Sequence, residues 1–129
     1  MKIEEVRTSF TVYLIASEIE RFDGIAEALK LAGYMTLTFN NLSSAFSELP
    51  SNPPHFLIFE SEERAFKLNK AIKQVVAQLP ESHIFLLTEL QNREKAVPLL
   101  EAGVYSLIYM PLVSQIELIQ ALDRAAERD

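Results

Sequence analysis

The sequence predicts a three-layer, doubly wound α/β fold, in which helices cover both faces of a five-stranded parallel sheet. Five short apolar runs recur along the 129 residues, and three of them are almost continuously apolar. Continuous apolar runs are typical of strands that are buried on both faces. Segments with helical periodicity separate the runs, and this alternation requires crossover connections, which make neighbouring strands parallel.

The expected strands span residues 11–16, 34–39, 55–60, 83–88 and 105–109. The first helix is predicted between the first two strands. Its apolar stripe contains Phe22, Ile25, Ala26 and Leu29. Glycine is expected to close two helices in a left-handed conformation, at Gly33 and Gly103.

Proline interrupts the fourth expected helix, because Pro98 lies five residues before Gly103. A proline inside an unbroken helix loses one backbone hydrogen bond and clashes with the preceding turn, at a cost of about 3 kcal/mol or more. We therefore expect this helix to begin at Val97–Pro98, where proline suits the first turn, or to kink there.

Composition indicates one globular domain, with 49% hydrophobic and 23% charged residues. The absence of cysteine excludes disulfides and thiolate metal sites. A net charge of −6 argues against binding to nucleic acid or anionic lipid, and no apolar run is long enough to cross a membrane. We expect a cytoplasmic protein with a loose N-terminal arm over residues 1–10 and a domain over 11–129, which an output domain could follow.

Four short segments lie where the expected strands end. In a parallel sheet the ends of these strands converge, so the four segments are expected to line one crevice. They are Ala16-Ser17-Glu18, Glu60-Ser61, Thr88-Glu89 and Met110-Pro111. No glycine-rich loop follows any strand, and the chain has three glycines in all, so nucleotide and flavin cofactors are disfavoured. His55 and His83 each begin a strand without further ligands nearby, so no metal site is predicted.

Several of these segments resemble the receiver domains of response regulators. The segment from Glu101-Ala102-Gly103 to Met110-Pro111-Leu112 is similar to the end of such a domain, and Ala32-Gly33-Tyr34 is similar to the exit of its first helix. The strands that end at Glu60 and Thr88 resemble those that end at the phosphorylated aspartate and at a hydroxyl residue. The resemblance covers the chain from Thr11 onward, and it implies the strand order 2-1-3-4-5.

The resemblance also shows what this chain has lost from the phosphorylation pocket. The two metal-binding acids of the family fall on Ala16 and Ser17, and Ser17 is better interpreted as a helix cap. The phospho-accepting aspartate falls on Glu60, whose carboxylate is one methylene further out; a misplacement of about 1 Å can cost roughly a hundredfold in rate. The lysine falls on Met110 and the aromatic switch residue on Leu107. Only Thr88 and Pro111 match the family pattern.

These losses predict a degenerate receiver, a pseudo-receiver, that a histidine kinase does not phosphorylate. Glu60 and Glu89 could form a carboxylate pair, but without a nucleophile or a second base we do not expect an enzyme. The leading hypothesis is a phosphorylation-independent module that regulates or scaffolds protein partners, in which Glu60 mimics part of the charge of a phosphorylated aspartate. The alternative is a small-molecule sensor whose ligand occupies the crevice beside Ala16, Thr88 and Met110.

Three apolar side chains are expected outside the buried stripes of their own elements, namely Val97, Tyr105 and Ile116. The strand order that the resemblance implies makes them neighbours, on the face that receiver domains use to dimerise or to engage outputs. We therefore expect a protein partner, or a weak symmetric homodimer, at the fourth helix, fifth strand and fifth helix.

Overall fold

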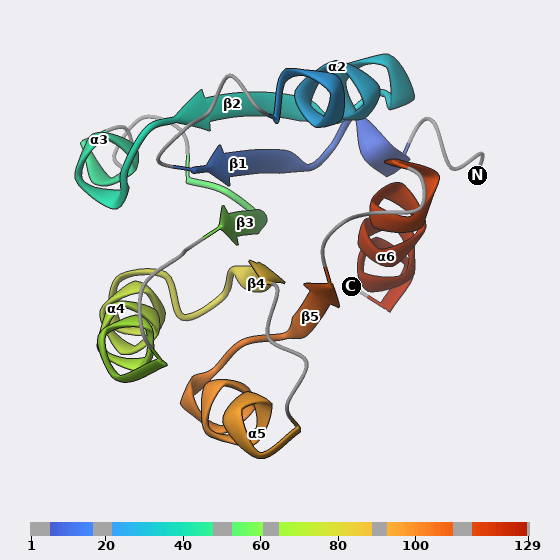
Figure 1. Ribbon diagram of the computed structural model, residues 1–129. Coiled ribbons are helices and arrows are strands. Elements are labelled where there is room, and N and C mark those ends of the chain that lie inside the picture. The colour runs from blue at the N-terminus through green and yellow to red at the C-terminus, as the bar shows by residue number, and fades with distance from the viewer. Residues whose placement is uncertain are drawn as a thin grey trace.

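The computed structural model describes residues 6–16, 22–47, 53–60, 65–88, 93–109 and 115–128, with side chains left out at 65–69, 93–96, 109 and 128. The described strands and helices alternate along the chain (Figure 1). The strands are β1 (Thr11–Ile15), β2 (Met35–Phe39), β3 (Phe56–Glu60), β4 (His83–Thr88) and β5 (Ser106–Tyr109). The helices are α2 (Asp23–Ala32), α3 (Leu42–Phe46), α4 (Ala65–Gln78), α5 (Arg93–Ala102) and α6 (Gln115–Arg128).

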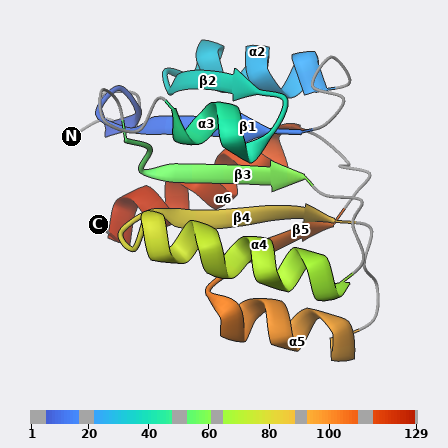
Figure 2. The same cartoon turned by 90° about the vertical axis from the view of Figure 1, so that its left-hand side faces the viewer.

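All five strands form one parallel sheet in the order β2-β1-β3-β4-β5, which confirms the predicted fold class and strand order. Each observed strand lies within a predicted run and begins or ends at most one residue inside it. The register places Ile15 beside Phe59 and Glu60 beside Leu87, so the strands end close to one level. Figure 2 shows the strands pointing in the same direction, with the loops at their carboxyl ends on one side.

Helices cover both faces of the sheet, as the continuous apolar runs predict. Helices α2 and α6 lie on one face, and α3, α4 and α5 lie on the other (Figure 1). The alternation of side chains along each strand supplies both cores: in β1, for example, Val12 and Leu14 face α2 and α6, whereas Tyr13 and Ile15 face the other layer.

Two glycines end helices in the conformation that the sequence predicts. Gly33 follows α2 with φ of 112°, and Gly103 follows α5 with φ of 126°. At Gly103 an added Cβ would also lie 2.5 Å from Cγ2 of Val76 on α4, so both the backbone and the space require glycine. The predicted stripe of α2 is confirmed as well, because all four of its members are buried.

Helix α5 begins at Arg93 and includes Pro98, so of the two predicted alternatives the start at Val97–Pro98 is wrong. The proline ring lies on the exposed side of the helix, and the next residue, Leu99, is buried in the core beside α4. Burial of a leucine side chain contributes about 1.5–3 kcal/mol, which offsets the backbone hydrogen bond that proline removes.

Residues 6–10, which belong to the predicted N-terminal arm, pack against the domain. Val6 and Phe10 pack against the core that α2 and α6 share, and Arg7 forms an ion pair with Asp123 of α6. The backbone of Phe10 also accepts a hydrogen bond from the N–H of Met35 at 3.3 Å. Local composition could not reveal these contacts, because every partner lies at least 25 residues away.

None of the helices in the described part of the chain combines the length and the apolar character that a membrane span requires.

Candidate functional site

The candidate site at the carboxyl ends of the strands is partly described. Ala16 directly follows β1 and donates its backbone N–H to the carbonyl oxygen of Phe39 at 3.1 Å. Glu60 ends β3 and Thr88 ends β4. The fold therefore places Ala16, Glu60 and Thr88 at the carboxyl-terminal end of the sheet. Because neighbouring strands lie about 4.8 Å apart, Ala16 and Glu60 are close neighbours at this edge.

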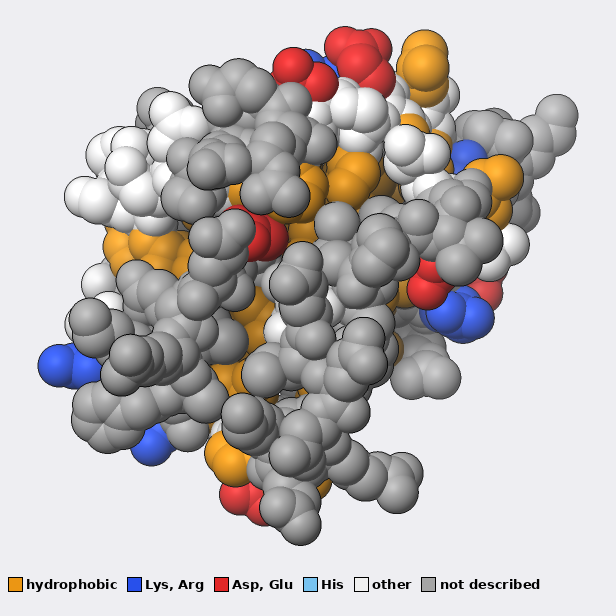
Figure 3. Space-filling view, in the orientation of Figure 1, with side chains coloured by type: hydrophobic (Ala, Val, Ile, Leu, Met, Phe, Trp, Pro, Cys, Tyr) orange, Lys and Arg blue, Asp and Glu red, His pale blue; other side chains and the backbone are white. Residues whose placement is uncertain are grey.

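The environments of these residues differ. Ala16 and Thr88 are buried, whereas Glu60 is half-buried. Figure 3 looks onto this end of the sheet, where acidic and hydrophobic side chains are visible between residues drawn in grey. Leu107 of β5 is partly buried and packs against the core that α4 and α5 cover.

Several predicted site residues lie outside the described part of the chain, namely Ser17, Glu18, Glu89, Met110 and Pro111. Their identities come from the sequence, and their positions follow Ala16, Thr88 and β5 directly in the chain. Among the residues that the structure describes, no three histidine, aspartate or glutamate side chains gather as metal ligands would.

The predicted interface residues are all exposed. The exposed fraction is 44% for Val97 on α5, 37% for Tyr105 before β5 and 61% for Ile116 on α6, and Leu100 on α5 is exposed as well. Ile116 lies in the first turn of α6, whose other apolar residues, Leu118, Leu122 and Ala125, are buried in the core. The surface thus carries large apolar side chains on the three elements that the sequence predicts.

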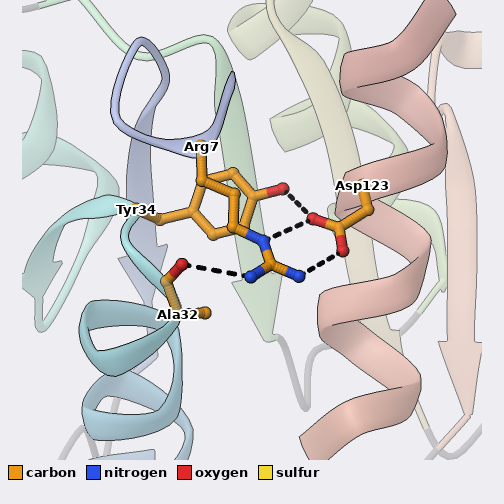
Figure 4. A network of polar contacts seen from close by, with 4 residues as sticks. All are labelled: Arg7, Ala32, Tyr34 and Asp123. Carbon is orange, nitrogen blue, oxygen red and sulfur yellow. Dashed lines mark hydrogen bonds and ion pairs between the residues drawn. The ribbon is translucent and has the colours of Figure 1, made fainter. Parts of the chain in front are cut away.

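A polar network that the sequence did not predict lies at the opposite, amino-terminal end of the sheet (Figure 4). Arg7 donates from Nε and Nη2 to the two carboxylate oxygens of Asp123, at 3.0 and 2.7 Å. Its Nη1 donates to the carbonyl oxygen of Ala32 at 3.2 Å, near the end of α2. The hydroxyl of Tyr34 donates to Oδ1 of Asp123 at 2.6 Å. The network therefore joins the N-terminal segment, the α2–β2 turn and α6.

The ionisation of this network reflects its burial. Burial, followed by the hydrogen bond to Asp123, raises the pKa of the Tyr34 hydroxyl far above its ordinary value. Burial alone would raise the pKa of the Asp123 carboxyl, but hydrogen bonds from Arg7 and Tyr34, with the guanidinium charge, outweigh burial and lower that pKa. The fold therefore favours a neutral tyrosine and a charged aspartate.

A row of aromatic rings crosses the sheet beside this network. Phe56 of β3 lies at its centre, with ring centroids 5.2 Å from Phe10, 6.2 Å from Tyr34 and 5.8 Å from Phe85. His83 and Tyr105 continue the row toward β5, with centroids 4.5 Å apart. Tyr34 belongs to both the row and the polar network, so the two features form one structural unit.

One sequence signal pointed to this unit. The aromatic residues Phe10, Tyr34, Phe56 and Tyr105 each lie at or next to the start of a strand, as do His55 and His83. Because parallel strands begin at one end of the sheet, the strand register brings these rings into contact. The interpretation of the two histidines as strand-edge residues is consistent with this arrangement.

Comparison with known proteins gives structural matches only. No family model matches the sequence, and a search of curated proteins finds no match. A response regulator from Thermotoga maritima has a TM-score of 0.81 at 16% identity, covering 91% of this chain and 97% of its own. A putative pilus assembly-related protein from Burkholderia pseudomallei has a TM-score of 0.80 at 17% identity, covering 94% of this chain and 92% of its own.

The receiver domain of NtrX from Brucella abortus has a TM-score of 0.77 at 22% identity, covering 92% of this chain and 99% of its own. At these identities the likeness concerns the fold and not the chemistry of the site. The strand order and these similar structures together show that this chain has the fold of a response-regulator receiver domain.

Proposed function

We propose that this protein is a pseudo-receiver: a signalling module of the receiver type that acts through protein contacts and independently of phosphorylation. One observation carries the proposal. The edge of the sheet where the receiver fold holds its acids and its acceptor aspartate here presents the buried methyl group of Ala16 beside Glu60. Magnesium requires oxygen ligands in near-octahedral geometry, and alanine offers none.

The sequence adds two further losses at this edge, because Ser17 stands in place of the second acid and Met110 in place of the lysine. A methionine cannot neutralise the charge of a phosphoryl group. Glu60 supplies a permanent negative charge at the acceptor position, so in this proposal the module is held in one signalling state without catalytic turnover.

Phosphorylation chemistry gives the first test. We expect no phosphate incorporation when the protein is incubated with acetyl phosphate and Mg²⁺, as measured by intact mass spectrometry. The matched positive control restores the family pattern with Ala16→Asp, Ser17→Asp, Glu60→Asp and Met110→Lys. This variant should gain one phosphate group if it folds, which circular dichroism checks. Incorporation on Glu60 in the unmodified protein would overturn the proposal.

The partner surface of the proposal consists of α5, β5 and α6. Its support is the exposure of the apolar side chains Val97, Tyr105 and Ile116. Small apolar patches of this kind suit weak, two-fold symmetric association or the binding of an output domain. The same fold occurs within longer chains, since a structure of NtrX matches 92% of this chain over 27% of its own length.

Sedimentation gives the second test, with Ile116→Glu as the disrupting variant. If the protein self-associates through this surface, the variant should be monomeric at concentrations where the wild type is not. Leu31→Glu is the matched control, because Leu31 on α2 is 84% exposed and lies outside the proposed surface. Association that survives Ile116→Glu and disappears with Leu31→Glu would place the interface on α2 instead.

A further inference from the structure

A surface groove lies between the start of β5 and α6, on the face of the sheet that α2 and α6 cover. Its volume is about 290 Å³. The residues that line it are Phe85, Tyr105, Ser106, Ala121 and Arg124. They come from β4, β5 with its preceding residue, and α6, so the groove requires the assembled fold.

Two of the residues that line the groove are aromatic. Phe85 is fully buried below it, and the ring of Tyr105 lies with its centroid 5.4 Å from that of Phe85, at an interplanar angle of 55°. Ala121 of α6 also lines the groove, and a larger side chain at this position would fill part of it. A planar apolar body matches these walls, because aromatic rings favour edge and offset contacts at such distances.

The polar part of the groove is the guanidinium group of Arg124, which forms no ion pair with a described carboxylate. Within the described part of the chain the ion pair of α6 joins Arg7 to Asp123, and none involves the neighbouring Arg124. Arg124 is exposed at the rim of the groove, in a chain whose net charge is −6. A guanidinium group offers two parallel N–H donors that match a carboxylate.

From its apolar and polar parts we propose that the groove binds a small planar carboxylate, about the size of one aromatic ring with its carboxylate group. In this arrangement the ring lies against Tyr105 and Ala121, and the carboxylate meets the guanidinium of Arg124. The volume supports a ligand of this size, since it lies near the lower limit of ligand pockets, roughly 300 Å³.

This site is distinct from the crevice at the carboxyl ends of the strands. Phe85 pairs with Ser106, and Thr88 pairs with Tyr109, three residues further along both strands. Three residues of a strand span about 10 Å. The groove therefore lies toward the amino-terminal end of the sheet, where Tyr105 connects it to the aromatic row through His83. Its existence does not depend on whether Glu60 is ever phosphorylated.

The test uses the whole chain, with benzoate as the probe and benzamide as a neutral molecule of the same shape. In a titration followed by ¹H–¹⁵N NMR, benzoate should give saturable shifts of the amide signals of Ser106, Ala121 and Arg124. Loss of a charge-assisted hydrogen bond costs about tenfold in affinity, so we expect that loss for benzamide and for Arg124→Gln. Lys73→Gln on α4, which removes an exposed cation from the opposite face, should leave the affinity unchanged.

A second variant fills the groove without changing its charge. Ala121→Met should abolish the saturable shifts while the remaining amide spectrum keeps its folded dispersion. The proposal is overturned if benzoate gives no saturable shifts at millimolar concentration, or if Arg124→Gln binds as well as the wild type. Shifts that centre on Glu60 and Thr88 would also overturn it, because they would assign the ligand to the carboxyl-end crevice.

Discussion

The two ends of the sheet place a carboxylate, Glu60 or Asp123, in very different surroundings. At the carboxyl ends of the strands, Glu60 is half-buried beside Ala16, and no metal-binding group of acids gathers among the described residues. At the amino ends, Asp123 accepts hydrogen bonds from Arg7 and Tyr34, which stands beside a row of aromatic rings. We infer that the contacts of Asp123 at the amino-terminal end contribute more to the stability of the fold than Glu60 does at the carboxyl-terminal end.

The largest effect expected from this comparison is at Phe56, the centre of the aromatic row. Phe56→Ala should reduce the free energy of unfolding by about 3–5 kcal/mol, because it leaves a cavity among Phe10, Tyr34 and Phe85. Urea denaturation measures the loss. Phe56→Leu is the control and should lose less, since it retains more of the buried volume. Equal losses for the two variants would show that the loss comes from the ring contacts and not from the buried volume.

The second effect concerns the charge of Asp123. At pH 7, Asp123→Asn should cost about 2 kcal/mol of unfolding free energy, because hydrogen bonds to charged groups contribute about 1.5–3 kcal/mol. The fold lowers the pKa of this carboxyl, so its stabilisation is complete above the unfolded value of about 3.9 and is lost as pH falls through the folded pKa. The wild type and the variant should therefore converge in stability below about pH 4. A constant difference down to the acid transition would contradict the proposed linkage.

The smallest effect is expected from the same chemical change at the other end of the sheet. Glu60→Gln should alter the free energy of unfolding by less than about 1 kcal/mol at pH 7, because Glu60 is half-buried and removing its charge leaves no cavity. Urea denaturation in parallel with Asp123→Asn gives a matched comparison of carboxylate and amide. If Glu60→Gln cost as much as Asp123→Asn, the carboxyl-terminal end would also be a stabilising region.

The strands, their burial on both faces and the glycines that end two helices were predictable from the sequence because they depend on local patterns. Continuous apolar runs require burial on both faces, and Gly33 and Gly103 stand where the chain needs a positive φ. The convergence of Ala16, Glu60 and Thr88 at one edge also followed, since parallel strands that end at one level bring their ends together. The exposure of Val97, Tyr105 and Ile116 followed from the same helical and strand periodicity.

Only the tertiary structure decided which distant residues meet. Arg7 and Asp123 are separated by 116 residues, and either one alone resembles an ordinary exposed charge in the sequence. The continuation of α5 through Pro98 likewise depends on the burial of Leu99 against other elements, which outweighs a local preference. The groove beside Arg124 arises because Phe85 and Ser106 pair across β4 and β5 below the small side chain of Ala121. Local propensities act over a few residues, whereas these contacts are set by strand register and helix packing, which only the folded chain defines.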